Sequence, residues 1–246
     1  MPVRYPVPQN ISEVLEVLDD ILAECNTRGN YLGIFAWVYR RTTAEIQKAI
    51  QDGRFANNQR MEIFDVRFAR YYIDAYYAFT EGRPVSKSWE IAFLSANDRL
   101  TILQHLMMGM NAHINLDLGV TAAVLTPGDQ IAEMEGDFMI VNDILEELVD
   151  EMQERMSQVS PLFWLVDRLG QNDDERFADF SMRKARTNAW NLACLLATMD
   201  ETSRDAGIKT ADAAVAAIGG TIKQPPGRWI RFLLNTAGRF ERKFTW

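Results

Sequence analysis

The sequence predicts an all-α protein, a single bundle-like domain of about eight to ten helices around a central buried helix near residues 98–125. Apolar residues recur at the three- and four-residue spacing of an amphipathic helix along most of the 246-residue chain. Several of these patterns end at a glycine, the residue that most often follows a helix. No alternating apolar and polar stretch of useful length indicates a strand, so helices are the only regular structure that we expect.

The first three helices are predicted from apolar stripes and from the residues that end them. In the first, apolar side chains form one stripe with acids opposite, and Asn10 or Ser12 can cap its start. The second and third patterns end at Gly53 and Gly82. The three ranges are 11–25, 30–53 and 60–82.

A long helix is predicted over residues 98–125, after a short one over residues 88–96. Asn97 or Asp98 can cap the long helix, and Pro127 stops it because proline cannot continue the hydrogen-bond ladder. Breaks are expected around Gly207 and in the sequences GQNDD and GGTIKQPPG. The remaining helical patterns cover residues 130–157, 161–169, 174–200, 208–218 and 228–240.

Residues 1–218 are predicted to form the helical domain and residues 219–246 a C-terminal helical appendage. The appendage is basic and rich in apolar and aromatic residues, a pattern that can dock on an acidic partner or a membrane surface. Because the whole chain is acidic, packing of the appendage on the protein's own body is the favoured prediction. Its charged residues are Lys223, Arg228, Arg231, Arg239, Arg242 and Lys243 against Glu241 alone.

Charge and composition exclude several classes of function. The formal charge of −8 argues against a general affinity for nucleic acid or anionic lipid, which is dominated by Lys and Arg. The N-terminus has no secretory signal, and no apolar run approaches the roughly 18 residues of a spanning helix, so we expect a cytoplasmic, soluble protein. Cys25 and Cys194 are too far apart to indicate a thiolate zinc site or a disulfide framework.

The stretch MMGMNAHINLDLGV, residues 107–120, places polar side chains inside the most apolar helix. His113 and Asp117 lie one turn apart on one face, and Asn111 and Asn115 form a second pair that points toward a different neighbour. His105, two turns before His113, shares a broad stripe with the first pair. A helix that is apolar nearly all round is usually buried, so these side chains need partners.

Metal binding is the sharpest hypothesis for this cluster. His113 and Asp117 have the spacing at which an imidazole and a carboxylate can reach one cation such as zinc, iron or manganese. Because the chain has only two histidines, the other ligands must be carboxylates, amides or water. The acids and amides that lie among apolar residues are Asp65, Asp74, Asp137, Asn142 and Asp143, and the predicted ligands among them are Asp65, Asp74 and Asp137. The alternative is a structural hydrogen-bond network that fixes helix packing.

Two further features bear on the cluster. Arg186, one turn before Trp190, can pair with a buried acid such as Asp74 or Asp117, or can bind an anionic substrate. Gly109 and Gly119 each cost about 1 kcal/mol in a helix interior, which indicates close backbone approach or a ligand there.

Several stretches resemble a largely bacterial family of unknown function, DUF5995, over about residues 10–200. They are FDVRFARYYIDAYYAF, SWEIAF, ILQHLMMGMNAHINLDLG, DFMIVNDIL and RTNAW. The resemblance implies an all-helical fold and names no activity, cofactor or substrate. The positions that it marks are Asp65, Phe68, Tyr71, Asp74, Trp89, Phe93, Asn111, His113, Asn115, Asp117, Asp137, Asn142, Arg186 and Trp190.

Two functions from different classes follow. The first is a metal-assisted hydrolase or related enzyme acting on a small substrate, with His113, Asp117 and Arg186 as catalytic residues. The second is a non-catalytic helical module that binds a small molecule or a protein, and it is favoured by the many aromatic and methionine residues. No nucleotide-binding or nucleophile motif is present, and a homo-oligomer is compatible with the sequence.

Overall fold

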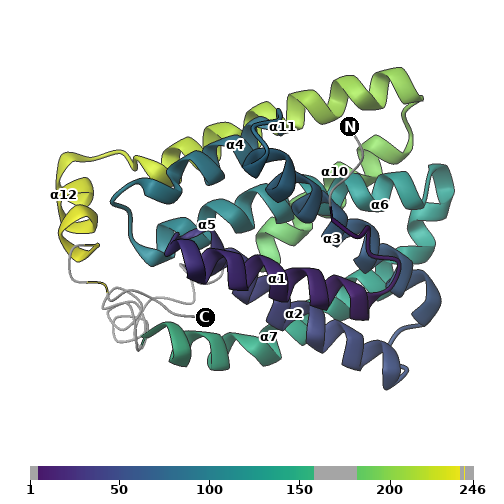
Figure 1. The fold of residues 1–246 in the computed structure, drawn as a ribbon. Coiled ribbons are helices and arrows are strands. Elements are labelled where there is room, and N and C mark those ends of the chain that lie inside the picture. Colours follow the sequence, from purple (N-terminus) through teal and green to yellow (C-terminus); the bar gives the residue numbers. More distant parts are fainter. Residues whose placement is uncertain (1–4, 158–181, 239–240, 242–246) are drawn as a thin grey trace, which may run out of the picture.

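The computed structural model describes residues 5–157, 182–238 and 241. In these residues every regular element is a helix, which confirms the all-α prediction, and Figure 1 shows their arrangement. The 3-10 turns are η1 (Ser95–Asn97) and η3 (Gly128–Met134), and η2 (His113–Leu118) is a π-helix. The α-helices are α1 (Ile11–Arg28), α2 (Leu32–Gln51), α3 (Asn58–Thr80), α4 (Lys87–Leu94), α5 (Ile102–Ala112), α6 (Gly119–Leu125), α7 (Glu135–Ser157), α10 (Met182–Ala197), α11 (Glu201–Lys223) and α12 (Arg228–Ala237).

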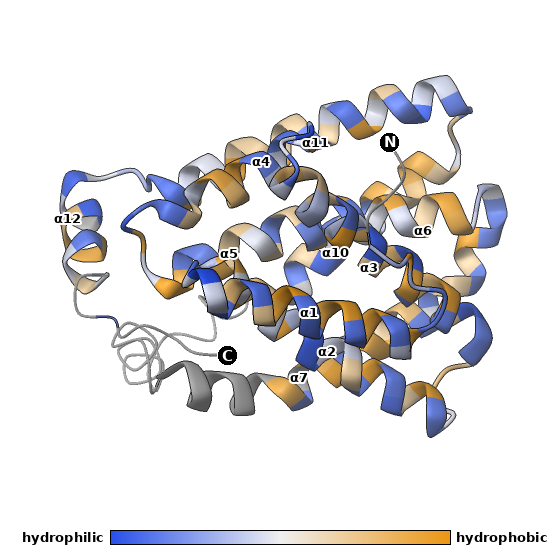
Figure 2. Ribbon diagram, in the orientation of Figure 1, coloured by the Kyte–Doolittle hydropathy of each residue, from blue (hydrophilic) through white to orange (hydrophobic). Residues whose placement is uncertain are grey.

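The core lies where the other helices surround α5, η2 and α6. These three elements form one uninterrupted helix, which contacts α2, α3, α4, α10 and α11. α1 packs on α2 and α3. Along most helices apolar residues alternate with hydrophilic ones in the manner of amphipathic helices (Figure 2). The predicted central buried helix is therefore confirmed.

The central helix begins at Ile102, later than predicted. Thr101 caps it, since its hydroxyl accepts from the Gln104 backbone N–H while the Gln104 side chain accepts from the Thr101 N–H. This reciprocal pair is a capping box. Asn97 instead ends the 3-10 turn η1 and Asp98 follows it, so the prediction that either caps this helix was wrong.

Close approach of neighbouring groups explains both glycines of the central helix. A Cβ added at Gly109 would lie 2.6 Å from Cγ of Phe35, and one at Gly119 would lie 2.7 Å from the backbone oxygen of Ala189. Neither distance is compatible with a side chain unless a neighbour moves. The two residues therefore let α2 and α10 pack tightly against the central helix.

The second half departs from the prediction at two breaks. Gly207 and Gly219 both lie inside α11, so the break expected at Gly207 was wrong. The helix ends at Lys223, and Gln224 and two prolines follow it. The proposed boundary at residues 218–219 thus falls within a helix. The helix predicted over residues 161–169, and the start of that over 174–200, lie outside the described residues.

In the described part of the chain, none of the helices is both long enough and apolar enough to cross a membrane.

Candidate functional site

The π-helix η2 coincides with the sequence HINLDL and holds the predicted His113–Asp117 pair. Nδ1 of His113 lies 3.0 Å from Oδ2 of Asp117, and the same oxygen accepts a 2.9 Å hydrogen bond from the indole N–H of Trp89 on α4. The hydroxyl of Thr121 donates to the backbone oxygen of Asp117 at 2.7 Å. π-helical turns inside α-helices are rare, and those that occur are often found at functional sites.

The asparagine pair faces another neighbour. Nδ2 of Asn111 donates to the backbone oxygen of Val215 on α11 at 2.9 Å, and Oδ1 of Asn111 accepts from Asn115 at 3.0 Å. This pair ties the central helix to α11, while His113 and Asp117 face α3 and α4. One helix therefore serves two polar environments, and the asparagines have a structural role.

Aromatic rings enclose the imidazole of His113. The ring of Phe68 stacks on it with centroids 3.7 Å apart, and Tyr39 and Phe35 present edges at 4.5 and 5.5 Å. Only 1% of His113 is exposed to solvent. Because burial penalises the imidazolium, the pKa of His113 lies well below its ordinary value and the ring is neutral.

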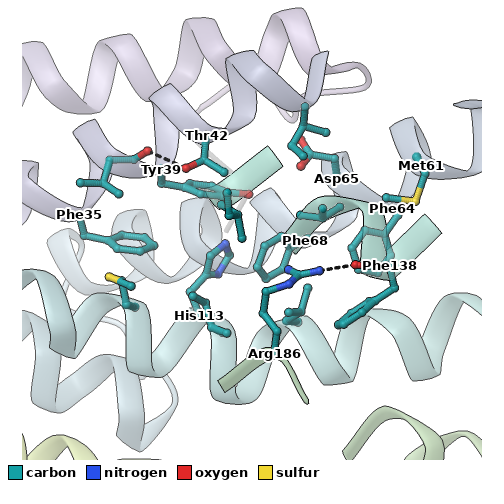
Figure 3. Close-up of a pocket in the computed structure, with 17 residues that line it drawn as sticks. Phe35, Tyr39, Thr42, Met61, Phe64, Asp65, Phe68, His113, Phe138 and Arg186 are labelled. Carbon is teal, nitrogen blue, oxygen red and sulfur yellow. Dashed lines mark hydrogen bonds between the residues drawn. The ribbon is translucent and has the colours of Figure 1, made fainter. Parts of the chain in front are cut away.

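A cavity of about 70 Å³ lies beside His113. Its walls are mostly apolar and come from α2, α3, α5, η2, α7 and α10. Figure 3 shows His113 between Phe35 and Phe68, with Arg186 and Asp65 farther along the same cavity. The polar side chains that line it are Tyr39, Thr42, Asp65, His113 and Arg186.

Three of these polar groups have an atom without a hydrogen-bond partner among the described residues. They are Nε2 of His113, Oδ2 of Asp65 and the hydroxyl of Tyr39. Burial, with a smaller contribution from Glu62, raises the pKa of Asp65 to about 7. A buried polar atom without a partner costs free energy, so these three atoms are free to hydrogen-bond to water or to a ligand in the cavity.

Arg186 enters the cavity from α10. Its Nε donates to Oδ1 of Asn142, its Nη2 donates to the backbone oxygen of Phe138 at 2.6 Å, and its guanidinium lies 4.4 Å from the centroid of the Phe138 ring. The predicted ion pair with Asp74 or Asp117 is therefore wrong. Burial lowers the pKa of Arg186 to about 9, so the side chain remains a cation at neutral pH.

Asp137 and Asp74 are engaged elsewhere. Asp137 accepts from the backbone N–H groups of Ala56 and Asn57 at 2.7 and 3.2 Å and from Nη2 of Arg60 at 2.8 Å, which anchors the start of α3. Asp74 accepts from the hydroxyl of Tyr5. Neither residue lines the cavity.

The other two predicted residues of the polar site also lie outside the cavity. Tyr71 is half-buried beneath the guanidinium of Arg67, 5.8 Å from the ring centroid. His105 stacks on Tyr31 at 4.7 Å and lines a separate, smaller cavity. In residues 5–157, 182–238 and 241, no three His, Cys, Asp or Glu side chains are grouped to hold a metal ion.

Residues 11–225 match a protein family described as a family of unknown function, DUF5995. The chain belongs to the DUF5995 family. The match reaches the end of α11, beyond the stretch of about residues 10–200 on which the resemblance rested. No curated protein and no solved structure matches the chain.

Every residue that lines the cavity lies within the part matched to DUF5995. Two of the polar lining residues were not predicted from the sequence. Tyr39 and Thr42 are on α2, three residues apart, so one helical face can carry both to His113. The amphipathic pattern of residues 30–53 could have indicated that face. It could not indicate which other helix the face meets.

Proposed function

We propose that the cavity is the active site of a hydrolase or related enzyme that performs acid–base chemistry on a small substrate. The observation that carries this proposal is the unpartnered Nε2 of His113, which lines the cavity while Asp117 engages the other ring nitrogen. A carboxylate that orients a histidine in this way is the arrangement used by general bases in hydrolases.

His113 is the base in this proposal. With Asp117 ionised, Nδ1 carries the proton that it donates to Oδ2, and Nε2 presents a lone pair to the cavity. The Trp89 N–H supports the carboxylate, although burial raises the pKa of Asp117. From Nε2 the base can take a proton from a water molecule or from the substrate itself.

Asp65 is the acid. With a pKa of about 7 its carboxyl keeps its proton through mildly acidic conditions and can donate it to a leaving group. Burial thus keeps the base and the acid neutral around one cavity. An activity that needs protonated Asp65 declines as the pH rises above about 7.

Arg186 and the cavity walls restrict the substrate. Among the described residues the guanidinium contacts only neutral acceptors and an aromatic ring, so an anionic group of the substrate can neutralise its charge. The rest of the wall is aromatic and aliphatic. The expected substrate is therefore small and mostly apolar, with one anionic group.

If a divalent metal takes part in this chemistry, its binding site is this cavity. If zinc, iron or manganese takes part, Nε2 of His113 and the Asp65 carboxylate are the described side chains that would hold it, because Asp117 is engaged by His113 and Trp89. The ion would lower the pKa of a bound water or polarise a substrate oxygen.

A second candidate is a non-catalytic binding site for a small apolar molecule. The observation that favours it is the aromatic enclosure of His113, since Phe68 stacks on the ring as it would on a purely structural histidine. In this form Nε2 and Arg186 only orient the ligand.

The test is hydrolysis of the mono-p-nitrophenyl esters of succinate and glutarate, whose free carboxylate supplies the anionic group, by the full chain and by two variants. We expect His113→Gln to lose about 10²- to 10⁴-fold in kcat and Asp117→Asn to lose at least about tenfold. His105→Gln, in the other cavity, is the matched control and retains activity. Thermal melts report whether each variant is folded.

The outcomes separate the candidates. Turnover that survives His113→Gln overturns the catalytic proposal. If wild-type protein hydrolyses none of the esters while sodium benzoate raises its Tm, the binding site is the better description. Elemental analysis of untagged protein tests the metal: stoichiometric zinc, iron or manganese that is lost in His113→Gln assigns the metal-assisted form.

A further inference from the structure

The C-terminal helix α12 carries an exposed apolar face. Trp229, Phe232 and Leu233 are spaced at i, i+3 and i+4, so they lie on one side of the helix. Their exposed fractions are 80%, 61% and 64%. We call these three residues the α12 apolar face. Figure 1 shows α12 at one end of the molecule, after the turn that follows α11.

The same segment concentrates positive charge on an acidic protein. Arg228 and Arg231 are exposed on α12 itself. Residues 224–246 contain five basic side chains and one acidic side chain, whereas the whole chain carries a formal charge of −8. A negatively charged surface would therefore attract α12, through Arg228 and Arg231, more than it attracts the acidic chain as a whole.

Contacts at both ends attach α12 to the body while its apolar face stays in solvent. Lys223, just before the turn, pairs with Asp98 at 2.6 Å. Beyond the helix, Oε2 of Glu241 accepts from the backbone N–H of Ile102 at 2.6 Å. The α12 apolar face is thus exposed in a segment that these two contacts attach to the body.

We propose that α12 docks the protein on an anionic lipid surface. A short helix with Trp, Phe and Leu on one side and Arg beside them is the pattern of helices that lie in the membrane interface. Its 10 residues are far too few to span a bilayer. The positive charge of α12 complements anionic headgroups, and its Trp, Phe and Leu side chains can enter the apolar layer beneath them. The proposal is independent of the chemistry at His113.

Co-sedimentation with vesicles tests the proposal. Full-length protein is mixed with vesicles of phosphatidylcholine alone or of an equal mixture of phosphatidylcholine and phosphatidylglycerol, in about 0.1 M and about 1 M NaCl. We expect binding to the anionic vesicles only, weakened at high salt. The variant Arg228→Gln/Arg231→Gln should reduce the partition coefficient by roughly thirty-fold.

The apolar face has its own variant and matched controls. Trp229→Ser/Phe232→Ser/Leu233→Ser should reduce the partition coefficient by at least about 100-fold, because the inserted apolar area is lost. Ile63→Ser and Leu195→Ser remove apolar side chains of similar exposure, 53% and 56%, elsewhere on the surface, and should bind like wild type. All five substituted residues are exposed, and circular dichroism confirms that each variant is folded.

Three results would overturn the proposal. They are failure of wild-type protein to sediment with anionic vesicles, equal binding to both kinds of vesicle, and binding that survives the triple serine variant. Gel filtration tests whether the α12 apolar face binds a second copy of the chain instead. If wild-type protein is a dimer, the triple serine variant is a monomer and neither binds vesicles, the face is a dimer interface.

Discussion

At the scale of single residues, Asp65 links the cavity to the stability of the fold. In an unfolded chain this carboxyl ionises near pH 4, whereas in the folded protein its pKa is about 7. The folded state therefore binds the extra proton. The stabilisation is complete below about pH 4 and is lost as the pH rises through about 7. We expect wild-type protein to lose at most about 4 kcal/mol, relative to Asp65→Asn, across this range.

Urea unfolding between about pH 4.5 and 7.5 measures this difference. The exposed carboxylate of Asp205 supplies the control, since Asp205→Asn should leave the pH dependence of wild type unchanged. A parallel pH dependence in wild type and Asp65→Asn would mean that Asp65 is ionised in the folded protein, and the acid in the proposed chemistry would then be another group.

A substitution at Asp137 tests whether this carboxylate has a structural role or binds a metal. It accepts two backbone N–H groups and Arg60, so Asp137→Ala leaves buried donors without partners at the start of α3. We expect a loss of about 2 to 4 kcal/mol in the free energy of unfolding and no change in metal content. Chemical denaturation and elemental analysis check the two parts, and loss of bound metal with unchanged stability would contradict the assignment.

The residues of the site were predictable only where one helix decides the contact. His113 and Asp117 lie within one turn, so their spacing placed both side chains on one face, where they form a hydrogen bond. Arg186 was expected either to pair with a buried acid or to bind an anionic substrate, but its described partners come from α7. The sequence of a helix does not specify the angle at which it packs on a neighbouring helix. The resemblance to DUF5995 marked Asn142, but as a site residue, without showing that it holds Arg186.

At the scale of elements, the positions of most helices followed from apolar periodicity, and the errors were local. The capping box of Thr101 and Gln104 could have been recognised in the sequence. It places the start of α5 after Thr101 rather than after Asn97 or Asp98. The π turn was not readable. A one-residue difference in hydrogen-bond register leaves the apolar pattern nearly intact, and tertiary contacts such as that of Trp89 with Asp117 accompany it.

The glycines of the helices give an element-scale prediction with an internal control. Gly119→Ala places a methyl group 2.7 Å from the rigid backbone oxygen of Ala189, so α6 and α10 must separate. We expect a loss of about 1 to 3 kcal/mol. Gly220, inside α11, has nothing within 4 Å of an added Cβ, so Gly220→Ala should gain up to about 1 kcal/mol from helix propensity. Denaturant titration of both variants checks the signs, and a stabilising Gly119→Ala would show that the two helices are not tightly packed.

At the scale of the whole molecule, the sequence predicted the class and the centre of the fold but not the cavity. Helical periodicity and the apolar run around residues 102–125 were enough to identify a buried central helix. The cavity requires α2, α3, α7 and α10 to meet around the central helix, and only Asp65, His113 and Arg186 among its polar lining residues were expected together. Its aromatic walls belong to helices whose neighbours are set by packing, which a single sequence does not specify.

The same architecture predicts how protection from hydrogen exchange varies along the chain. The central helix from Ile102 to Leu125 is surrounded by α2, α3, α4, α10 and α11, so its amides should open only when the whole domain unfolds. α12 exposes its largest apolar side chains and should exchange with much lower protection. Hydrogen–deuterium exchange with mass spectrometry measures both segments in one experiment. Protection of α12 equal to that of α6 would mean that the C-terminal segment packs on the body in solution, whereas protection that rises only with anionic vesicles would place its packing partner in the lipid.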